Sequence, residues 1–149
     1  MSLKQRTRKS YKYSLPYRTR WSDNDQYGHM NNSIYYHLFD SIINAYLISH
    51  CAQDPLNSPT IGLVVSSHCQ FFAPLAFPTN LELCLRVNKL RKSSVEYEVG
   101  VFEDGVEEVR AVGGYTHVFV DAKTRKSISL RDKTREGLRN LLVDEISKL

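Results

Sequence analysis

The feature that most constrains the fold is an apolar, helix-periodic segment that runs from Ile34 to Leu47. Large apolar residues recur there at spacings of three and four, which predicts a long helix with one broad apolar face. These residues are Ile34, Tyr35, Leu38, Phe39, Ile42, Ile43, Tyr46 and Leu47. A helix with such a face must pack against another layer of structure, so the rest of the chain has to supply that layer.

The segments on either side of this helix have the residue types and alternation of β-strands. The predicted strands are residues 13–17, 62–72, 81–87, 95–101 and 106–120. Connections between the later strands are short, and Asp104-Gly105 is a typical hairpin turn, so we expect antiparallel pairing. About five strands around one long central helix predict an α+β domain.

Three further features complete the expected organisation. The Gly113-Gly114 pair in the longest strand predicts a bend or bulge. Residues 50–59 contain two X-Pro steps and predict a loop. The segment 132–149 predicts a final helix, capped by Asp132 or Ser129. The apolar positions of that helix are Leu138, Leu141, Leu142 and Ile146.

The length and the cysteines indicate a single domain without metals. At 149 residues, of which 42% are hydrophobic, the chain can bury one core, so we expect one domain over residues 1–149. Cys51, Cys69 and Cys84 form no C-x-x-C pattern, so neither a disulfide framework nor a zinc site is predicted. We therefore expect no metal, no cofactor and a reducing compartment.

The N-terminal segment is strongly basic, and residues 1–12 are predicted to form a solvated arm. Mitochondrial transit peptides have a similar composition, but strand-like alternation begins at Tyr13 and leaves little room for one. No apolar run approaches the roughly 20 residues that cross a bilayer. We expect a soluble, cytoplasmic protein that binds no membrane, with mitochondrial import as the alternative.

Polar residues crowd the approach to the predicted helix, in the sequence WSDNDQYGHMNNSIY from Trp21 to Tyr35. Its first half is typical of a loop, and Asn31, Asn32 and Ser33 are good N-caps for the helix. N–H groups at a helix N-terminus can polarise a carbonyl, and a nearby carboxylate can attack it or activate water. This arrangement suits acyl transfer. The alternative is that Asp23 and Asp25 only form Asx turns and cap the helix.

The motif D-x-D-x-x-G-H-x-N-N-x-x-x-Y after R-x-R-W resembles the acyl-CoA thioesterases of the hotdog fold, the 4-hydroxybenzoyl-CoA thioesterase-like group. The segments HCQFFAPLAF and GGYTHVFVDAKTRKSISL resemble later parts of the same family, so the resemblance covers roughly residues 13–141. It implies a curved antiparallel sheet wrapped around the central helix. It also implies homodimers or homotetramers that join at strand edges, with active sites at the dimer interface.

The resemblance also implies roles for individual residues. In the family, the second Asp of the motif acts on the thioester carbonyl as nucleophile or general base, and here that residue is Asp25. The N–H groups that hold the carbonyl oxygen correspond to Asn31 and Asn32, and Gly28 allows the chain to approach closely. His29 either orients Asp25, hydrogen-bonds the acyl group or only fixes the loop.

Other residues have less direct assignments. Asp23 is expected to tie the loop to Arg18 or Arg20. Tyr35 is expected in the core, where its ring can also line the acyl pocket. In a dimer, Ser66 and Ser67 can face the active site of the partner. His68 and His117 are expected to be hydrogen-bonded core or interface residues. The three cysteines have no activating partner nearby in sequence.

Coenzyme A enters as part of the substrate, and its phosphates need cationic partners. The chain has a net charge of +4, and Lys89, Arg91 and Lys92 are clustered in a predicted turn. A second basic group, Lys123, Arg125 and Lys126, competes for that role. Both clusters can also be plain solvated turns.

Two other function classes fit parts of the sequence. One is an enzyme acting on acyl carrier protein, or a hotdog domain that binds acyl groups without catalysis. The other is nucleic-acid binding through tyrosines among basic residues, namely Tyr11, Tyr13 and Tyr17. No RRM or KH signature is present, so we expect no nucleic-acid partner. The sequence favours acyl-CoA hydrolysis, with the acyl chain undetermined.

Overall fold

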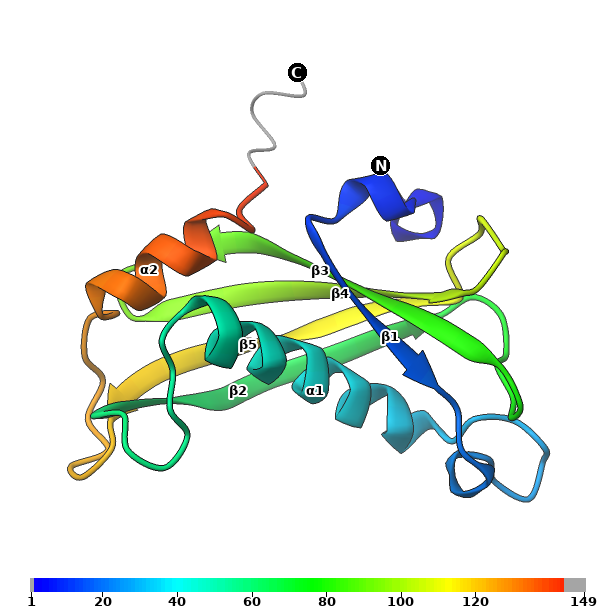
Figure 1. The fold of residues 1–149 in the computed structure, drawn as a ribbon, viewed down its shortest axis with the longest axis horizontal. Coiled ribbons are helices and arrows are strands. Elements are labelled where there is room, and N and C mark those ends of the chain that lie inside the picture. Colours follow the sequence, from blue (N-terminus) through cyan, green and yellow to red (C-terminus); the bar gives the residue numbers. More distant parts are fainter. Residues whose placement is uncertain (1, 144–149) are drawn as a thin grey trace.

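The structure, a computed structural model, describes residues 2–143 and contains a five-stranded antiparallel sheet that curves around one long helix (Figure 1). The strands are β1 (Tyr13–Arg18), β2 (Thr60–Phe71), β3 (Asn80–Leu90), β4 (Ser94–Glu103) and β5 (Ala111–Asp121). The α-helices are α1 (Asn32–His50) and α2 (Asp132–Arg139), and short 3-10 helices span Leu3–Gln5, Arg8–Ser10 and Trp21–Asp23. The strand order is β1-β3-β4-β5-β2, so β1 and β2 form the two edges. The predicted α+β hotdog fold is confirmed.

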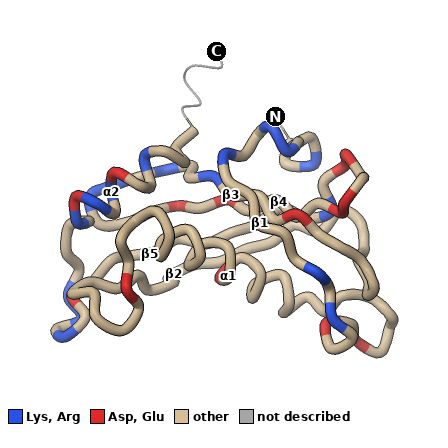
Figure 2. Tube along the Cα trace, in the orientation of Figure 1, with Lys and Arg blue, Asp and Glu red and all other residues tan. Residues whose placement is uncertain are grey.

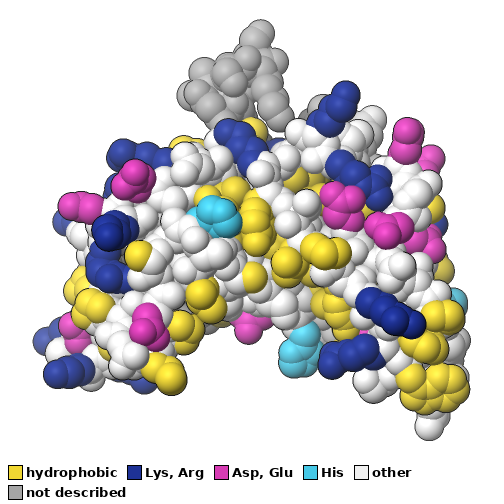
Figure 3. Space-filling model, viewed as in Figure 1, with side chains coloured by type: hydrophobic (Ala, Val, Ile, Leu, Met, Phe, Trp, Pro, Cys, Tyr) yellow, Lys and Arg dark blue, Asp and Glu magenta, His cyan; other side chains and the backbone are white. Residues whose placement is uncertain are grey.

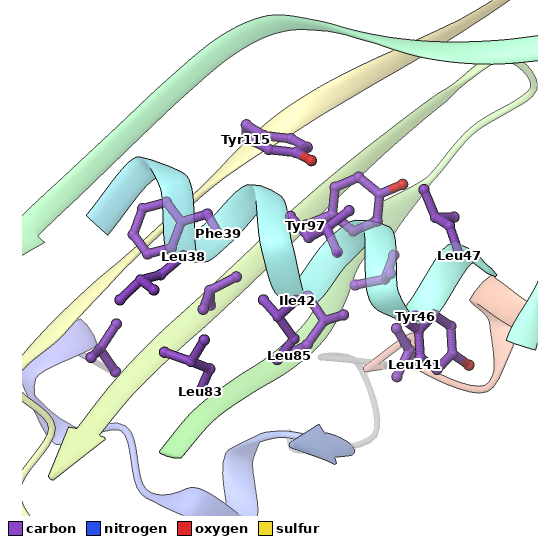
Figure 4. Packing of buried hydrophobic residues seen from close by; sticks show 14 of the residues in the cluster. Leu38, Phe39, Ile42, Tyr46, Leu47, Leu83, Leu85, Tyr97, Tyr115 and Leu141 are labelled. Atoms are coloured by element: carbon purple, nitrogen blue, oxygen red, sulfur yellow. The ribbon is translucent and has the colours of Figure 1, made fainter. Parts of the chain in front are cut away.

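The central helix α1 buries the apolar face that its spacing predicts. Phe39, Ile42 and Ile43 are fully buried, and the helix packs against the odd-numbered residues of β3 and β4 (Figure 4). Its close approach to the sheet depends on Gly113, because a Cβ atom there would lie 2.7 Å from the Phe39 ring. The predicted bend at Gly113-Gly114 lies in this region, where the pairing of β4 with β5 is interrupted between Glu96–Thr116 and Val99–Gly113.

Two predicted elements are shorter than expected. The last strand begins at Ala111 rather than Val106, because the chain after Asp104-Gly105 forms a longer connection. The last helix ends at Arg139, and its N-cap is Arg131 without a side-chain cap, so both predicted caps are wrong. Beyond the helix, the Val87 N–H donates to the Leu141 carbonyl at 3.0 Å, and the Val143 N–H donates to the Val87 carbonyl at 3.1 Å. Ile146 lies outside the described residues.

The prediction of a solvated N-terminal arm is wrong, because this segment packs on the face of the sheet opposite α1. Arg6 forms a bidentate ion pair with Glu98, and the two side chains are only 10% and 5% exposed. The hydroxyl of Tyr11 donates to the same carboxylate at 2.7 Å. Arg8 pairs with Glu82 at 2.9 Å. The arm is therefore part of the fold.

The three tyrosines considered as stacking platforms are also engaged within the fold. Tyr11 is buried, Tyr13 packs edge-on against Tyr46, and Tyr17 donates its hydroxyl to Asp23 at 2.6 Å. Within residues 2–143, none of the helices is both long enough and apolar enough to cross a membrane.

His117 on β5 is a buried histidine, as expected, and it makes stability depend on pH. Its Nδ1 lies 3.0 Å from the Tyr97 hydroxyl, and burial lowers the pKa of His117 from 6.5 to about 4. In the unfolded chain the imidazole binds a proton near pH 6.5, whereas the folded protein binds it only near pH 4. Protonation therefore favours unfolding as the pH falls between these values, by about 3 kcal/mol in all.

We expect chemical denaturation at pH 7 and at pH 4.5 to show this loss of unfolding free energy. His117→Gln, which cannot titrate, is expected to flatten the dependence in this range. His37→Gln is the matched control, because His37 is exposed on α1. An unchanged dependence in His117→Gln would contradict the assignment.

Candidate active site

The motif segment forms a loop that is closed by backbone hydrogen bonds at the N-terminus of α1. Asp25 N–H donates to the His29 carbonyl, and Asn31 N–H donates to the Asp23 carbonyl, both at 2.9 Å. Gly28, at φ +81°, takes the left-handed conformation that the tip requires and that other residues adopt rarely. Met30 N–H donates to the Leu75 carbonyl at 2.7 Å, which ties the loop to the segment after β2.

Asp25 lies at the tip of this loop and faces a pocket of about 360 Å³. The carboxylate is half-buried, and Oδ1 accepts the Tyr27 N–H at 2.8 Å. Among the described residues, Oδ2 has no hydrogen-bond partner. One oxygen is thus held in place by an Asx turn, and the other is open to a reacting group.

The pocket wall combines the loop, the start of α1 and the segment after β2. Its lining residues are Asp25, Tyr27, His29, Met30, Asn32, Tyr35, Phe71, Phe72, Ala73 and Pro74. Tyr35 is buried, as expected, and its ring packs edge-on against Phe71 at 4.9 Å. Burial raises the pKa of Tyr35 to about 12, so its hydroxyl stays protonated near neutral pH. The wall suits an apolar acyl group.

The two asparagines have different roles. Asn31 is the N-cap of α1, and its Oδ1 accepts the Ser33 N–H at 3.0 Å. The Asn31 N–H donates to the Asp23 carbonyl, so it is not available to bind a substrate oxygen. The Asn32 N–H has no partner within residues 2–143, and Asn32 lines the pocket. Of the two predicted amides, only that of Asn32 can polarise a carbonyl here.

Asp23 is structural, in agreement with the sequence interpretation. Its side chain is 1% exposed, and Oδ2 accepts the Tyr17 hydroxyl at 2.6 Å and the Arg20 N–H at 2.8 Å. The Arg20 guanidinium lies 3.5 Å from Oδ1. This carboxylate fixes the base of the loop and is not open to a substrate.

His29 lines the same pocket as Asp25 but forms no side-chain hydrogen bond with any described residue. Its carbonyl, rather than its ring, is what closes the loop. The exposed imidazole is therefore placed to meet a substrate. The cysteine nearest to this wall is Cys69, and burial raises the pKa of its thiol to about 12, which leaves it protonated and poorly nucleophilic.

Ser67 lies elsewhere, in a second pocket of about 400 Å³ between α1 and the edge strand β2. That pocket also contains Asp40, whose Oδ1 accepts the Tyr115 hydroxyl at 2.9 Å. Ser66, Ser67 and His68 are all exposed along β2. Within one subunit, Ser67 does not share a pocket with Asp25.

The basic cluster Lys89, Arg91 and Lys92 lies at the far end of the sheet from Asp25 (Figures 1 and 2). The loop of Asp25 adjoins the start of β3, because Thr19 N–H donates to the Thr79 carbonyl at 3.0 Å. The cluster follows the end of β3, about 30 Å away at the rise of an extended strand. Lys123, Arg125 and Lys126 follow β5, whose end pairs with the start of β2 rather than with the end near Phe71. One subunit does not bring either cluster together with the pocket.

Sequence reasoning missed the wall formed by residues 71–74. Phe72 and Ala73 N–H groups both donate to the Arg110 carbonyl, at 2.8 and 3.2 Å, which fixes this wall against the start of β5. These residues lie in the segment HCQFFAPLAF, which resembles part of the hotdog thioesterase family. Its place beside Asp25 depends on tertiary contacts, which periodicity does not show.

Comparisons with known proteins agree with this geometry. The family model of the thioesterase superfamily matches residues 27–110. The crystal structure of the PA5185 protein from Pseudomonas aeruginosa strain PAO1 is similar at a TM-score of 0.90. It has 43% sequence identity and covers 93% of this chain and 96% of that one. No curated protein sequence matches the chain significantly.

More distant structures share the fold. Slr0204, a 1,4-dihydroxy-2-naphthoyl-CoA thioesterase from Synechocystis, has a TM-score of 0.79 at 15% identity, covering 87% of this chain and 96% of that one. The Dynemicin thioesterase has a TM-score of 0.81 at 14% identity, covering 89% of this chain and 98% of that one. At these identities the likeness establishes the fold alone.

Proposed function

The chain belongs to the thioesterase superfamily, and from this premise we propose that it hydrolyses acyl-CoA thioesters in the pocket that contains Asp25. One observation carries the proposal: an open carboxylate oxygen and an unpaired helix N-terminal N–H line the same pocket. The first can supply or activate a nucleophile, and the second can stabilise negative charge on the carbonyl oxygen.

The proposed reaction follows from these two groups. The thioester carbonyl oxygen accepts the Asn32 N–H, and the acyl group lies against Tyr35 and Phe71. Asp25 then either attacks the carbonyl carbon or removes a proton from an attacking water. The C–S bond breaks and the thiolate leaves, taking up a proton, while water supplies the hydroxyl of the free acid. A carboxylate suffices because a thiolate, with a thiol pKa near 8 to 9, is a good leaving group.

We further propose that the active form is a dimer or tetramer joined through β2. This edge strand exposes Leu63, Val64 and Val65, and an exposed apolar edge invites pairing with another strand. In such a pair, Ser67 and the basic cluster at residues 89–92 of one subunit can reach the pocket of the other. We place the protein in the cytoplasm on the grounds of its free cysteines.

The experiment that tests this function measures thiol release from a panel of thioesters. The panel contains short, medium, long and aromatic acyl groups, each on coenzyme A, on acyl carrier protein and on pantetheine. We expect turnover of the coenzyme A thioesters, with the panel identifying the acyl group. Turnover of the carrier-protein thioesters alone would favour the alternative carrier. Binding of acyl groups without any thiol release would contradict the hydrolase assignment.

A further inference from the structure

The loop that carries Asp25 also carries the two most exposed aromatic residues of the described chain. Trp21 is 83% exposed and Tyr27 is 89% exposed. Tyr27 lines the pocket, whereas Trp21 lies at the base of the loop, where its ring meets Phe77 edge-on at 6.1 Å. An exposed indole presents its ring face to solvent, where a planar group can stack on it. Trp21 therefore offers an open platform for a planar group.

Two arginines closely precede this tryptophan in the chain. Arg18 ends β1 and Arg20 directly precedes Trp21, and both are exposed. Within residues 2–143, Arg18 has no ion-pair partner. The Arg20 guanidinium donates to the Tyr17 hydroxyl and lies beside the Asp23 carboxylate. Its positive charge therefore offsets the negative charge of Asp23. Figure 3 shows basic side chains beside a hydrophobic group where β1 ends. We call Arg18, Arg20 and Trp21 the loop-base patch.

The loop-base patch lies within reach of the pocket in the same subunit. Trp21 and Asp25 are four residues apart, so their Cα atoms are at most about 14 Å from one another. The basic cluster at residues 89–92 lies about 30 Å away, at the other end of β3. A ligand can therefore place its reacting group at Asp25 and an anionic, aromatic end on the loop-base patch of the same subunit.

We propose that the loop-base patch binds the nucleotide end of coenzyme A, with adenine stacked on Trp21 and phosphates paired with Arg18 and Arg20. The inference rests on the proposed function, because it supposes that coenzyme A carries the acyl group. Stacking on an indole uses the open ring face, and guanidinium groups bind phosphate oxygens in bidentate geometry. The flexible pantetheine arm then runs along the loop to place the thioester between Asp25 and Asn32.

Trp21 is the only tryptophan of the chain, so its fluorescence reports on this site directly. We expect coenzyme A and adenosine 3′,5′-bisphosphate to quench and shift the emission, and pantetheine to leave it unchanged. Calorimetry gives the affinity independently of the fluorophore. Trp21→Ala is expected to weaken binding of coenzyme A about tenfold, while Trp21→Phe retains most of it. Arg18→Gln is expected to weaken binding of both nucleotides, with Lys133→Gln on α2 as the control for lost charge.

Kinetics provide the second measurement. For one acyl group, the ratio of kcat/KM on coenzyme A to kcat/KM on pantetheine is expected to fall about tenfold in Trp21→Ala. A merely structural disturbance of the loop would lower both values together and leave the ratio unchanged, which would overturn the assignment. The assignment also fails if the ratio collapses in Lys89→Gln/Arg91→Gln/Lys92→Gln and not in Arg18→Gln, because a partner subunit would then supply the phosphate site.

The two proposals fail separately. The hydrolase proposal fails if the wild type releases thiol from no thioester, whatever Trp21 reports. The nucleotide assignment fails if thioesters are hydrolysed while saturating coenzyme A leaves the Trp21 emission unchanged. Quenching that is lost in Arg18→Gln and retained in the triple variant supports the assignment.

Discussion

Replacing Asp25 by asparagine is expected to lower kcat for thioester hydrolysis by about 100-fold or more, a loss of at least ~2.7 kcal/mol of transition-state stabilisation. The amide keeps the shape of the side chain, and its oxygen can still accept the Tyr27 N–H that forms the Asx turn. Only the negative charge on the open oxygen is lost. Without it the side chain can neither attack the carbonyl nor accept a proton from water.

The matched control for this substitution is Asp54→Asn. Asp54 lies in an exposed loop, and its Oδ1 accepts the N–H of the residue two positions later, Leu56, at 3.1 Å. The two aspartates thus share a local geometry and differ in their surroundings. We expect Asp54→Asn to keep wild-type kcat. Equal thermal stability of the two variants would show that the loss in Asp25→Asn is chemical. Wild-type turnover in Asp25→Asn would mean that the chemistry depends on another group.

Replacing Glu98 by glutamine is expected to lower the free energy of unfolding by about 3 kcal/mol or more, because the carboxylate is a buried partner of charged groups. Arg6 donates to both its oxygens, at 2.9 and 3.1 Å, and the fully buried Arg86 lies 3.9 Å away. Burial alone would raise the pKa of Glu98, but hydrogen bonds from Arg6, Tyr11 and Asn88 lower it below its ordinary value. The folded protein therefore depends on the ionised form.

Glu96→Gln on the same strand is the comparison for this loss. Glu96 pairs with Arg91 at 3.4 Å, and these side chains are 37% and 51% exposed. An exposed pair contributes at most about 1 kcal/mol. Denaturant titration of both variants at neutral pH measures the difference. If Glu98→Gln were as stable as Glu96→Gln, the N-terminal segment would not be anchored through this carboxylate.

Much of the fold could be predicted from the sequence, because the decisive signals are local. The spacing along α1, the cap at Asn31 and the alternation of β3 and β4 each act within one element. The N-terminal arm was mispredicted for the opposite reason. Its arginines pair with Glu82 and Glu98, which are far away in sequence. A cluster of basic residues does not by itself indicate such distant partners.

The site could be predicted only in part. The motif indicated Asp25, and local chemistry indicated the structural role of Asp23. The choice between the Asn31 and Asn32 amides needed the hydrogen bond from Asn31 to the Asp23 carbonyl, which the folded loop alone reveals. The wall at residues 71–74 needed the register of β2 on β5, which sets where the chain turns beside the pocket.

The hydrogen bond from the Met30 N–H to the Leu75 carbonyl joins two segments that line different parts of one pocket. One segment carries Asp25 and His29, and the other supplies Phe71, Phe72, Ala73 and Pro74 to the wall of the same pocket. This connection is independent of side-chain identity, since it runs from an amide to a carbonyl. Side chains at 71–74 can therefore be exchanged without removing the hydrogen bond that holds the loop, so the lining of the pocket and the position of Asp25 can be varied independently.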